Sequence, residues 1–390
     1  MPAAAMIMIS NFGRSDGGRE TWAYNFIPRL LERDGGLHLH VFGVRRPGEA
    51  DSRVELLAAV RPQDRNRLHL HFGEIGKSRW PVGLKAIGTL SRLISDTALP
   101  RIDYTLAVGS LMELLVVLRS PKLSRSLKLA WLRTIYVEEK AGQIHPALRK
   151  PAGMVEHFIL ARADVLVANG DDTAAHYRRQ GLDVEVIRNA IDVERWRREA
   201  PPPNLSPLRV GYIGRLGRVK GINEFVALAR SWGGSDPPVE FHVIGAGIDH
   251  APVEAARDEG KLIFHGAVAN DRLPEALAGL DATVALTFKS KDGGTSGLSN
   301  ALLEQMAAGK VVIAWRNEIF CQLLDDRSAY LVEQGSVAGL RTAIEEIFKN
   351  PDEAESRARE AQRLASQNSF DEHMARFERL IEREAGGKET

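Results

Sequence analysis

The 390-residue chain contains a single cysteine, Cys321. One cysteine cannot form an internal disulfide, and this scarcity is typical of a reducing compartment. Apolar runs long enough to cross a bilayer are also missing, since LMELLVVL at 111–118 is too short and includes Glu113. The first residues, MPAAAMIMISNFG, have no basic region in front of the apolar stretch. We therefore predict a first β-strand there, and neither a signal peptide nor a transmembrane helix.

A strong net charge is absent too. The formal net charge is +1, so nothing draws the whole chain to nucleic acid, and we predict no nucleic-acid partner. Hydrophobic residues make up 44% and charged residues 26%, an ordinary globular composition. The length suits two domains of roughly 150–200 residues each.

Several ligand-binding motifs are not found. There is no G-x-G-x-x-G after the first strand, no G-x-x-x-x-G-K-[ST], no H-E-x-x-H, and no D-x-D pair to hold a metal on a nucleotide sugar. We predict neither a metal nor a bound cofactor. The pairs His38/His40 and His69/His71 each place two rings on one face of a strand. A metal site is one interpretation of these pairs, and histidines on the solvent side of a sheet are the favoured one.

The charges are unevenly distributed. Residues 61–150 hold 16 Lys and Arg against 7 Asp and Glu. Within 76–94, basic residues flank an apolar stripe, and a second basic series runs through 119–133. Such patterns suit an anionic membrane surface, and equally a helix that packs on the core with a solvated basic face.

Short apolar runs alternate with helical patterns along the whole chain, which predicts parallel sheets with right-handed crossovers and an α/β class. The predicted strands are AMIMIS (5–10), LHLHVFG (37–43), YTLAVG (104–109), LKLAWLR (127–133), VLVAN (165–169), VEVIRN (184–189), LRVGYIG (208–214), VEFHVIG (239–245), KLIFHG (261–266), ATVALTF (282–288), VVIAW (311–315) and AYLVE (329–333). They fall into two halves, which predicts two Rossmann-like domains.

A proline-rich stretch separates the halves. RREAPPPNLSP (197–207) has four prolines in eleven residues and no periodicity, as in a semi-rigid spacer. We predict an N-terminal domain over 1–197, a linker over 198–207, a C-terminal domain over 208–369, and a final amphipathic helix with a polar tail over 370–390. A cleft between two such domains is the default place for a ligand.

Two glycine-rich turns follow strands. SNFGRSDGGRETW places Gly17 and Gly18 at the start of a helix, where unpaired amides suit an anion. In YIGRLGRVKGINEF, Arg215 and Lys220 follow a strand end on a flexible loop. A guanidinium fork and an ammonium charge suit a diphosphate. The alternative is two solvated surface cations.

The stretch GTSGLSNALLE (294–304) runs from a polar loop into a helical pattern. Amides of Gly297, Leu298 and Ser299 would then face outward at a helix N-terminus, which suits a phosphate. Glu304 in the second turn could accept hydrogen bonds from the vicinal hydroxyls of a ribose. The alternative is an ordinary capped helix with Ser296 or Ser299 as N-cap and Glu304 in solvent.

Taken in order, these segments resemble the retaining GT-B glycosyltransferases of the family 4 (group 1) type. The similar segments are GGRE (17–20), VIRNAIDVERW (186–196), GRLGRVKG (214–221), VIGAG (243–247), FHGAV (264–268) and SGLSNALLEQMAAGKVVIA (296–314). The family pattern in the last segment is E-G-x-x-x-x-L-L-E-A-M-A-x-G-x-P-V-[IV]-A. The resemblance covers most of the chain and implies two Rossmann-like domains facing a central cleft.

The resemblance also implies a function: retaining transfer of a sugar from a nucleotide-diphosphate sugar to a saccharide or lipid-linked acceptor, as in the synthesis of cell-surface polysaccharide, lipopolysaccharide or another glycoconjugate. The C-terminal domain would bind the donor and the N-terminal domain the acceptor. Arg215 and Lys220 would neutralise the leaving diphosphate without a metal, and Glu304 would hold the ribose. The amides at 297–299 and at Gly17–Gly18 would assist, with Ser296 beside them. A cytoplasmic location, peripheral on the inner face of the membrane, fits such acceptors.

The sequence departs from the family pattern at three places. Ser296 occupies the position of a glutamate that contacts the donor sugar, and Asp292 is a candidate replacement. Ala190 replaces a glycine. No histidine follows the strand LKLAWLR, and Glu138 and Glu139 there are either a solvated pair or side chains that face the cleft. These departures keep two alternatives open: a non-catalytic relative that acts as a binding or partner subunit, and another enzyme on the same fold, such as an epimerase or a phosphorylase.

Overall fold

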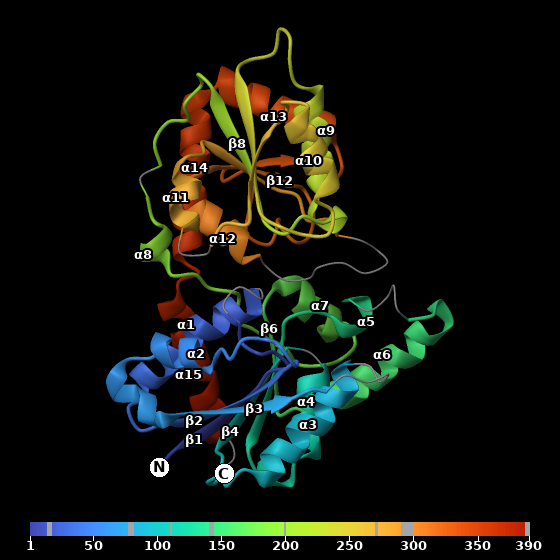
Figure 1. Ribbon diagram of the computed structural model, residues 1–390, viewed down its shortest axis with the longest axis vertical. Helices are drawn as coiled ribbons and strands as arrows, with labels where there is room; N and C mark the ends of the chain where they lie inside the picture. Colours follow the sequence, from blue (N-terminus) through green and yellow to red (C-terminus); the bar gives the residue numbers. More distant parts are fainter. Residues whose placement is uncertain are drawn as a thin grey trace. The chain divides into compact units, whose positions relative to one another are not determined.

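The computed structural model describes residues 1–13, 18–76, 82–109, 111–139, 144–198, 200–269, 272–289 and 299–386. The chain divides into two compact units, which are Met1–Asn189 together with Phe370–Thr390, and Ala190–Ser369. Each unit is built on one sheet whose recorded strand pairings are all parallel (Figure 1). The alternating strand and helix pattern of the sequence is therefore confirmed.

The first unit holds a seven-stranded sheet of order β3-β2-β1-β4-β5-β6-β7. Its strands are β1 (Ala3–Ile7), β2 (His38–Arg45), β3 (Leu68–Glu74), β4 (Tyr104–Gly109), β5 (Leu127–Leu132), β6 (Val165–Ala168) and β7 (Glu185–Val186). Its helices are α1 (Gly18–Arg33), α2 (Arg53–Ala59), α3 (Val82–Asp96), α4 (Leu111–Arg119), α5 (Tyr136–Glu139), α6 (Pro146–Leu160), α7 (Asp171–Arg178) and α15 (Phe370–Gly386), with short 3-10 turns η1 (Pro62–Arg67) and η2 (Pro121–Leu123).

The second unit holds a six-stranded sheet of order β10-β9-β8-β11-β12-β13. Its strands are β8 (Leu208–Ile213), β9 (Val239–Ile244), β10 (Ile263–Gly266), β11 (Ala282–Ala285), β12 (Val311–Trp315) and β13 (Tyr330–Val332). Its helices are α8 (Val193–Trp196), α9 (Ile222–Ser231), α10 (Ala251–Asp258), α11 (Leu273–Ala278), α12 (Asn300–Ala307), α13 (Val337–Lys349) and α14 (Pro351–Ser366), with the 3-10 turn η3 (Arg218–Lys220). Figure 1 shows α9 and α10 on one side of this sheet and α11, α12 and α14 on the other.

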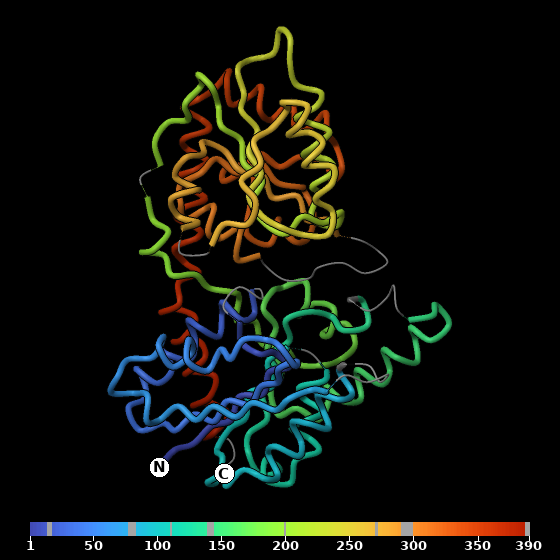
Figure 2. Tube along the Cα trace, viewed as in Figure 1, coloured from blue at the N-terminus to red at the C-terminus, as the bar shows by residue number. Residues whose placement is uncertain are grey.

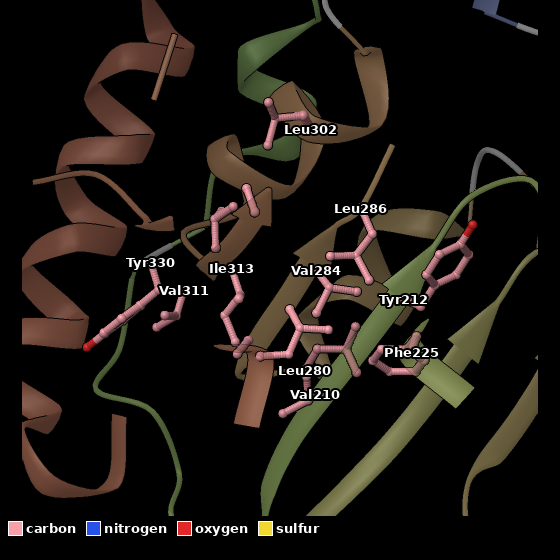
Figure 3. Close-up of a cluster of buried hydrophobic side chains, with 14 of the residues drawn as sticks. Val210, Tyr212, Phe225, Leu280, Val284, Leu286, Leu302, Val311, Ile313 and Tyr330 are labelled. Carbon is pink, nitrogen blue, oxygen red and sulfur yellow. The ribbon is translucent and has the colours of Figure 1, made fainter. Parts of the chain in front are cut away.

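The inner strands are apolar because helices cover both of their faces. Every residue of β12, VVIAW, is buried, which is the near-continuous hydrophobic run expected of a covered parallel strand. Figure 3 shows side chains from neighbouring strands meeting in the core of the second unit, among them Val210 of β8, Val284 of β11 and Ile313 of β12. The largest side chains there, such as Trp315, are fully buried. This core fixes the strand ends from which the loops of the candidate site leave.

The boundary between the units lies at 189/190, whereas the sequence placed residues 190–197 in the N-terminal domain. The reason is the short helix α8. Its Trp196 is 3% exposed and belongs to the hydrophobic core of the second unit. Ile191 also forms a bridge with Ser369, so the chain passes into and out of this unit at adjacent points.

The last helix, α15, completes the first unit. Trp22 of α1 donates a hydrogen bond from Nε1 to Nε2 of His373, at 2.9 Å. Nδ1 of His373 lies 2.8 Å from the carbonyl oxygen of Arg188. Trp131 of β5 stacks on His373 and Phe377. In Figure 2 the red end of the chain accordingly runs among the blue segments.

The four histidines of β2 and β3 form a ladder across the edge of the first sheet. His38 Nδ1 lies 3.1 Å from His69 Nε2, and His40 Nδ1 lies 3.2 Å from His71 Nε2. His71 also stacks on Phe42, a core residue, and His40 is only 6% exposed. The expectation of solvent-side histidines is therefore wrong for His40, because helix α3 covers this face of the sheet. Burial, aided by the neighbouring histidines, lowers the pKa of His40 to about 4.

Candidate functional site

The candidate site lies where the strand order of the second sheet reverses. Strands β8 and β11 are neighbours, but the chain proceeds from β8 toward β9 and β10, and from β11 toward β12 and β13. Loops at the carboxyl ends of two such strands leave in opposite directions, and this leaves room for a ligand. Here the two loops are joined by a hydrogen bond that the Phe288 amide donates to the Val219 carbonyl, at 2.8 Å.

Glycines make the close approach of these loops possible. Gly221 adopts a φ of 75°, and a Cβ at this position would lie 2.3 Å from the Cβ of Leu286. A Cβ at Gly245 would lie 1.8 Å from the carbonyl oxygen of Gly214. Both distances are far below any real contact, so glycine is required at 221 and 245. Steric demand therefore explains one glycine in each of the motifs GRLGRVKG and VIGAG.

The loop after β8 carries two cations, Arg215 and Lys220. Lys220 Nζ is 3.4 Å from the hydroxyl of Thr287, which follows β11. Burial, aided by the charge of Arg215, lowers the pKa of Lys220 to about 8. The backbone at Arg215 is fixed by a 2.8 Å hydrogen bond from the hydroxyl of Tyr212 to its carbonyl. Two like charges that act on one another favour a bound anion, which relieves their repulsion.

Helix α12 begins as the sequence predicts. Ser299 is its N-cap residue, in an extended conformation, and Glu304 lies in the second turn. Burial raises the pKa of Glu304 to about 7, although the nearby Arg195 opposes this rise. Glu304 is partly buried, so the expectation of a fully solvated carboxylate does not apply. A carboxylate with few water contacts is a strong acceptor for ligand hydroxyls.

The remaining predicted site residues are placed as follows. Gly18 is the exposed first residue of α1, in the first unit. Gly17, Asp292, Ser296, Gly297 and Leu298 lie outside the described residues. Their predicted roles at a phosphate or a donor sugar stay predictions.

Two residues near the site were not predicted. Thr287 brings a nearly buried hydroxyl to Lys220, and Arg195 of α8 brings a positive charge to Glu304. A threonine at the end of the strand ATVALTF is a weak signal that could have indicated the first. Nothing local could have indicated the second, because it depends on the packing of α8 against α12.

The strand ends of the first unit carry charges of both signs. Arg19 donates to Glu113 at 3.3 Å, to Glu20 at 3.2 Å and to the carbonyl of Ile9 at 3.0 Å. Arg133, after β5, lies over the ring of Trp22 at 5.3 Å. Burial and the charge of Arg19 lower the pKa of Arg133 to about 10. Nearby, Glu138 pairs with His176 at 3.3 Å, while the Glu139 side chain lies outside the described part.

The two basic segments are largely engaged within the fold. In 76–94, Ile87, Leu90 and Ile94 are buried in the core, and residues 77–81 lie outside the described part of the chain. In 119–133, Lys122 binds the carbonyls of Ser95 and Thr97, and Lys128 pairs with Asp164. Most apolar side chains of the described part of 76–94 pack on the sheet. This segment therefore corresponds to the alternative of a helix that packs on the core, rather than to a lipid contact.

Two further searches covered the described residues only. Within them, no three His, Cys, Asp or Glu side chains are arranged to hold a metal ion. Within the same ranges, no helix has the length and apolar content needed to cross a bilayer.

Comparison with known proteins assigns the class. Residues 207–350 match the model of the family described as "Glycosyl transferases group 1". This region is therefore a group 1 glycosyl transferase domain, and the predicted resemblance is confirmed for it. The match includes Arg215, Lys220, Thr287 and Glu304.

Individual relatives extend the similarity to most of the chain. It is 27% identical over 236 residues to a glycogen synthase of Mycobacterium tuberculosis, covering 58% of this chain and 56% of that enzyme. It is 27% identical over 299 residues to the 2-deoxystreptamine N-acetyl-D-glucosaminyltransferase of Streptomyces fradiae. This match covers 70% of this chain and 66% of that enzyme. The chain thus spans between half and two thirds of the length of these relatives.

A solved structure shows the fold. Anabaena Alr3699/HepE in complex with UDP and glucose superposes with a TM-score of 0.71 at 16% identity, covering 97% of this chain and 98% of that one. At this identity the likeness concerns the fold alone. The chain has the GT-B fold, with two Rossmann-like doubly wound domains, as predicted.

Proposed function

We propose that this protein is a retaining glycosyltransferase that moves a sugar from a nucleoside diphosphate sugar to a saccharide or lipid-linked acceptor. The observation that carries the proposal is the pair Arg215 and Lys220 at the switch point of the second sheet, whose charges interact, together with Glu304 on α12 of the same unit. The cations fit a diphosphate, and the carboxylate fits a ribose.

The chemistry follows from where charge develops. As the bond between the anomeric carbon and the β-phosphate oxygen breaks, negative charge grows on the leaving diphosphate. A positioned ammonium and guanidinium stabilise that charge and so lower the free-energy barrier to transfer. They provide the positive charge that a divalent cation would otherwise provide. The lowered pKa of Lys220 fits this role because the diphosphate would restore the charged form. We therefore propose a reaction that needs no metal.

The relatives support the donor and acceptor classes. Two of them are named as enzymes that build glycogen or glycosylate 2-deoxystreptamine, and HepE was solved with UDP and glucose. By analogy, the second unit binds the donor and the first unit binds the acceptor, with the proline-rich residues 198–207 as the linker between them. The same proposal includes retention of the anomeric configuration. It also includes a role in polysaccharide, lipopolysaccharide or glycoconjugate synthesis and a location at the inner face of the cell membrane.

The first test is a thermal-shift panel with UDP, GDP, ADP and CMP. A nucleotide at 100 times its dissociation constant should add about 2.7 kcal/mol of stability. We expect a shift with one diphosphate, and loss of that shift in the double variant Arg215→Ala/Lys220→Ala. Turnover of the matching sugar donor, followed by the proton coupling at the product's anomeric carbon, then tests retention.

A matched control is present on the same loop. The Arg218 side chain is exposed, while its backbone amide donates to Asp249 at 2.8 Å and its carbonyl accepts from the Gly221 amide at 3.0 Å. The variant Arg218→Ala should therefore keep the full nucleotide shift. If no nucleotide shifts the wild type, or if the double variant responds like the wild type, the proposal is wrong and a non-catalytic relative becomes the better interpretation.

A further inference from the structure

Helix α6 of the first unit carries a concentration of exposed apolar side chains. Leu148 is 58% exposed, Met154 73%, Val155 56% and Phe158 60%. Across the described ranges no other helix or strand carries more than one large apolar residue that is similarly exposed. Single exposed apolar residues are ordinary on protein surfaces, whereas four on one helix indicate a contact surface.

These side chains lie on one face of the helix. With about 100° per residue, the four positions and the exposed Pro151 fall within about 120° of the circumference, the width of an amphipathic stripe. The opposite face is bound to the fold, because Leu160 is fully buried and Glu156 is 3% exposed. Figure 1 shows α6 beyond α4, at the rim of the first unit.

The charges around this stripe have one sign. Glu156 is the only carboxylate between residues 144 and 163, and it is turned inward, where it accepts bonds from the Tyr177 hydroxyl at 2.7 Å and the Tyr136 amide at 3.0 Å. Lys150 and Arg162, in contrast, are exposed. The guanidinium of Arg162 lies 3.4 Å above the centre of the Phe158 ring. The outer face of α6 is therefore apolar and positive.

We propose that α6 is a membrane-docking helix that lies in the headgroup region of an anionic lipid surface. Apolar side chains with flanking cations match such a surface, because the chains enter the acyl boundary while the cations meet lipid phosphates. A two-fold contact between copies of this chain would instead set the same cations opposite one another, which is unfavourable. This assignment replaces the lipid contact expected from 76–94, whose described apolar residues are mostly taken up by the core.

The proposal names the surface on which the proposed enzyme would meet a lipid-linked acceptor, and so it rests on the proposed function. Its test is independent of turnover. The protein is floated with vesicles of phosphatidylcholine alone and with vesicles that also contain phosphatidylglycerol. We expect binding to the anionic vesicles only, and weaker binding as salt is added, since exposed charges are screened.

Two variants and one control sharpen the test. Met154→Gln/Val155→Gln/Phe158→Gln and Lys150→Glu/Arg162→Glu should each lower the vesicle partition coefficient at least tenfold. Val54→Gln is the matched control, because Val54 is equally exposed, at 73%, but stands alone on α2. Since all these side chains are exposed, the melting temperature and the nucleotide shift should stay unchanged in every variant.

Three outcomes would overturn the proposal. The first is that the wild type does not bind anionic vesicles, and the second is that the triple variant binds them as well as the wild type does. The third is that light scattering detects a concentration-dependent dimer of the wild type that the triple variant does not form. The last would assign α6 to a second copy of the chain. If the wild type binds anionic vesicles but shows no thermal shift with any nucleotide, the proposed function is rejected and the membrane-docking role of α6 is retained.

Discussion

The carboxyl ends of the two parallel sheets differ in how their charges are balanced. In the first unit, Arg19 lies within 3.3 Å of two carboxylates, those of Glu20 and Glu113. In the second unit, the charge of Arg215 acts on the partly buried Lys220 and, after burial itself, lowers its pKa. The carboxyl end of the first sheet thus places a cation beside two carboxylates, whereas the loop after β8 in the second unit holds two cations whose charges interact.

This difference indicates which unit is prepared for an anionic ligand. Bringing like charges together destabilises the free protein, and a bound diphosphate relieves that repulsion. In the first unit the charges of Arg19 and Arg133 also interact, but Arg19 is paired with two carboxylates, so the ligand of this unit is better sought among polyols such as sugars. Three predictions test the contrast, from the largest expected effect to the smallest.

Replacing Lys220 by alanine should lower kcat on the order of 10²–10³-fold, because one group that stabilises the leaving diphosphate is lost. Replacing Arg19 should change kcat less than tenfold if its role is structural. Steady-state kinetics with the donor found in the nucleotide panel measures both. Equal losses in the two variants would remove the contrast between the units.

Replacing Glu113 by alanine should destabilise the fold by about 2–3 kcal/mol. Glu113 is 2% exposed and accepts bonds from Arg19 and from the Ile9 amide, so its removal leaves both donors without their carboxylate. Urea denaturation measures the change. The double variant Arg19→Ala/Glu113→Ala should lose less than the sum of the single losses, and strict additivity would show that the pair is not coupled.

The histidine ladder should make the first unit sensitive to acid. The folded pKa of His40 is about 4, against about 6.5 in an unfolded chain, so the fold favours the neutral ring. The contribution of His40 is therefore complete above pH 6.5, and it is lost as the pH falls from 6.5 to 4. We expect a loss on the order of 1–2 kcal/mol, reduced by the solvent on one side of the ladder.

Hydrogen exchange of the two sheet edges compares the units directly. The corresponding edge of the second unit has the pair His242 and His265, whose ring nitrogens lie 3.0 Å apart, and Glu240 partly offsets the effect of burial on His242. Exchange in β2 and β3 should therefore accelerate more between pH 7 and pH 5 than exchange in β9 and β10. The variant His40→Gln should remove most of this difference, and an unchanged difference would refute the role of the ladder.

The strands and the loop after β8 could be predicted because their signals are local. A covered parallel strand such as VVIAW is apolar at every position, and a loop that passes another backbone closely needs glycine at fixed positions, as at Gly221. The second-turn position of Glu304 also follows from a local pattern, since Ser299 marks the start of α12.

What could not be predicted depends on contacts between distant segments. Alternation put the rings of His38 and His40 on one face, but only the packing of α3 decides that this face is covered. The approach of Arg195 to Glu304 and of Thr287 to Lys220 needs the folded unit. The second unit starts at residue 190 because Trp196 is buried in its core, and the amino-acid composition does not change at this point of the sequence.

The placement of α15 has a consequence for how the protein is made. Phe370, His373, Met374, Phe377 and Leu380 are all buried in the first unit, although they are translated after the whole second unit. On the ribosome, the second unit can finish folding while the first still exposes Trp22 and Trp131. The domain that begins the chain is thus the last to be completed, and a nascent chain stopped before residue 370 would leave an open aromatic surface for chaperones to bind.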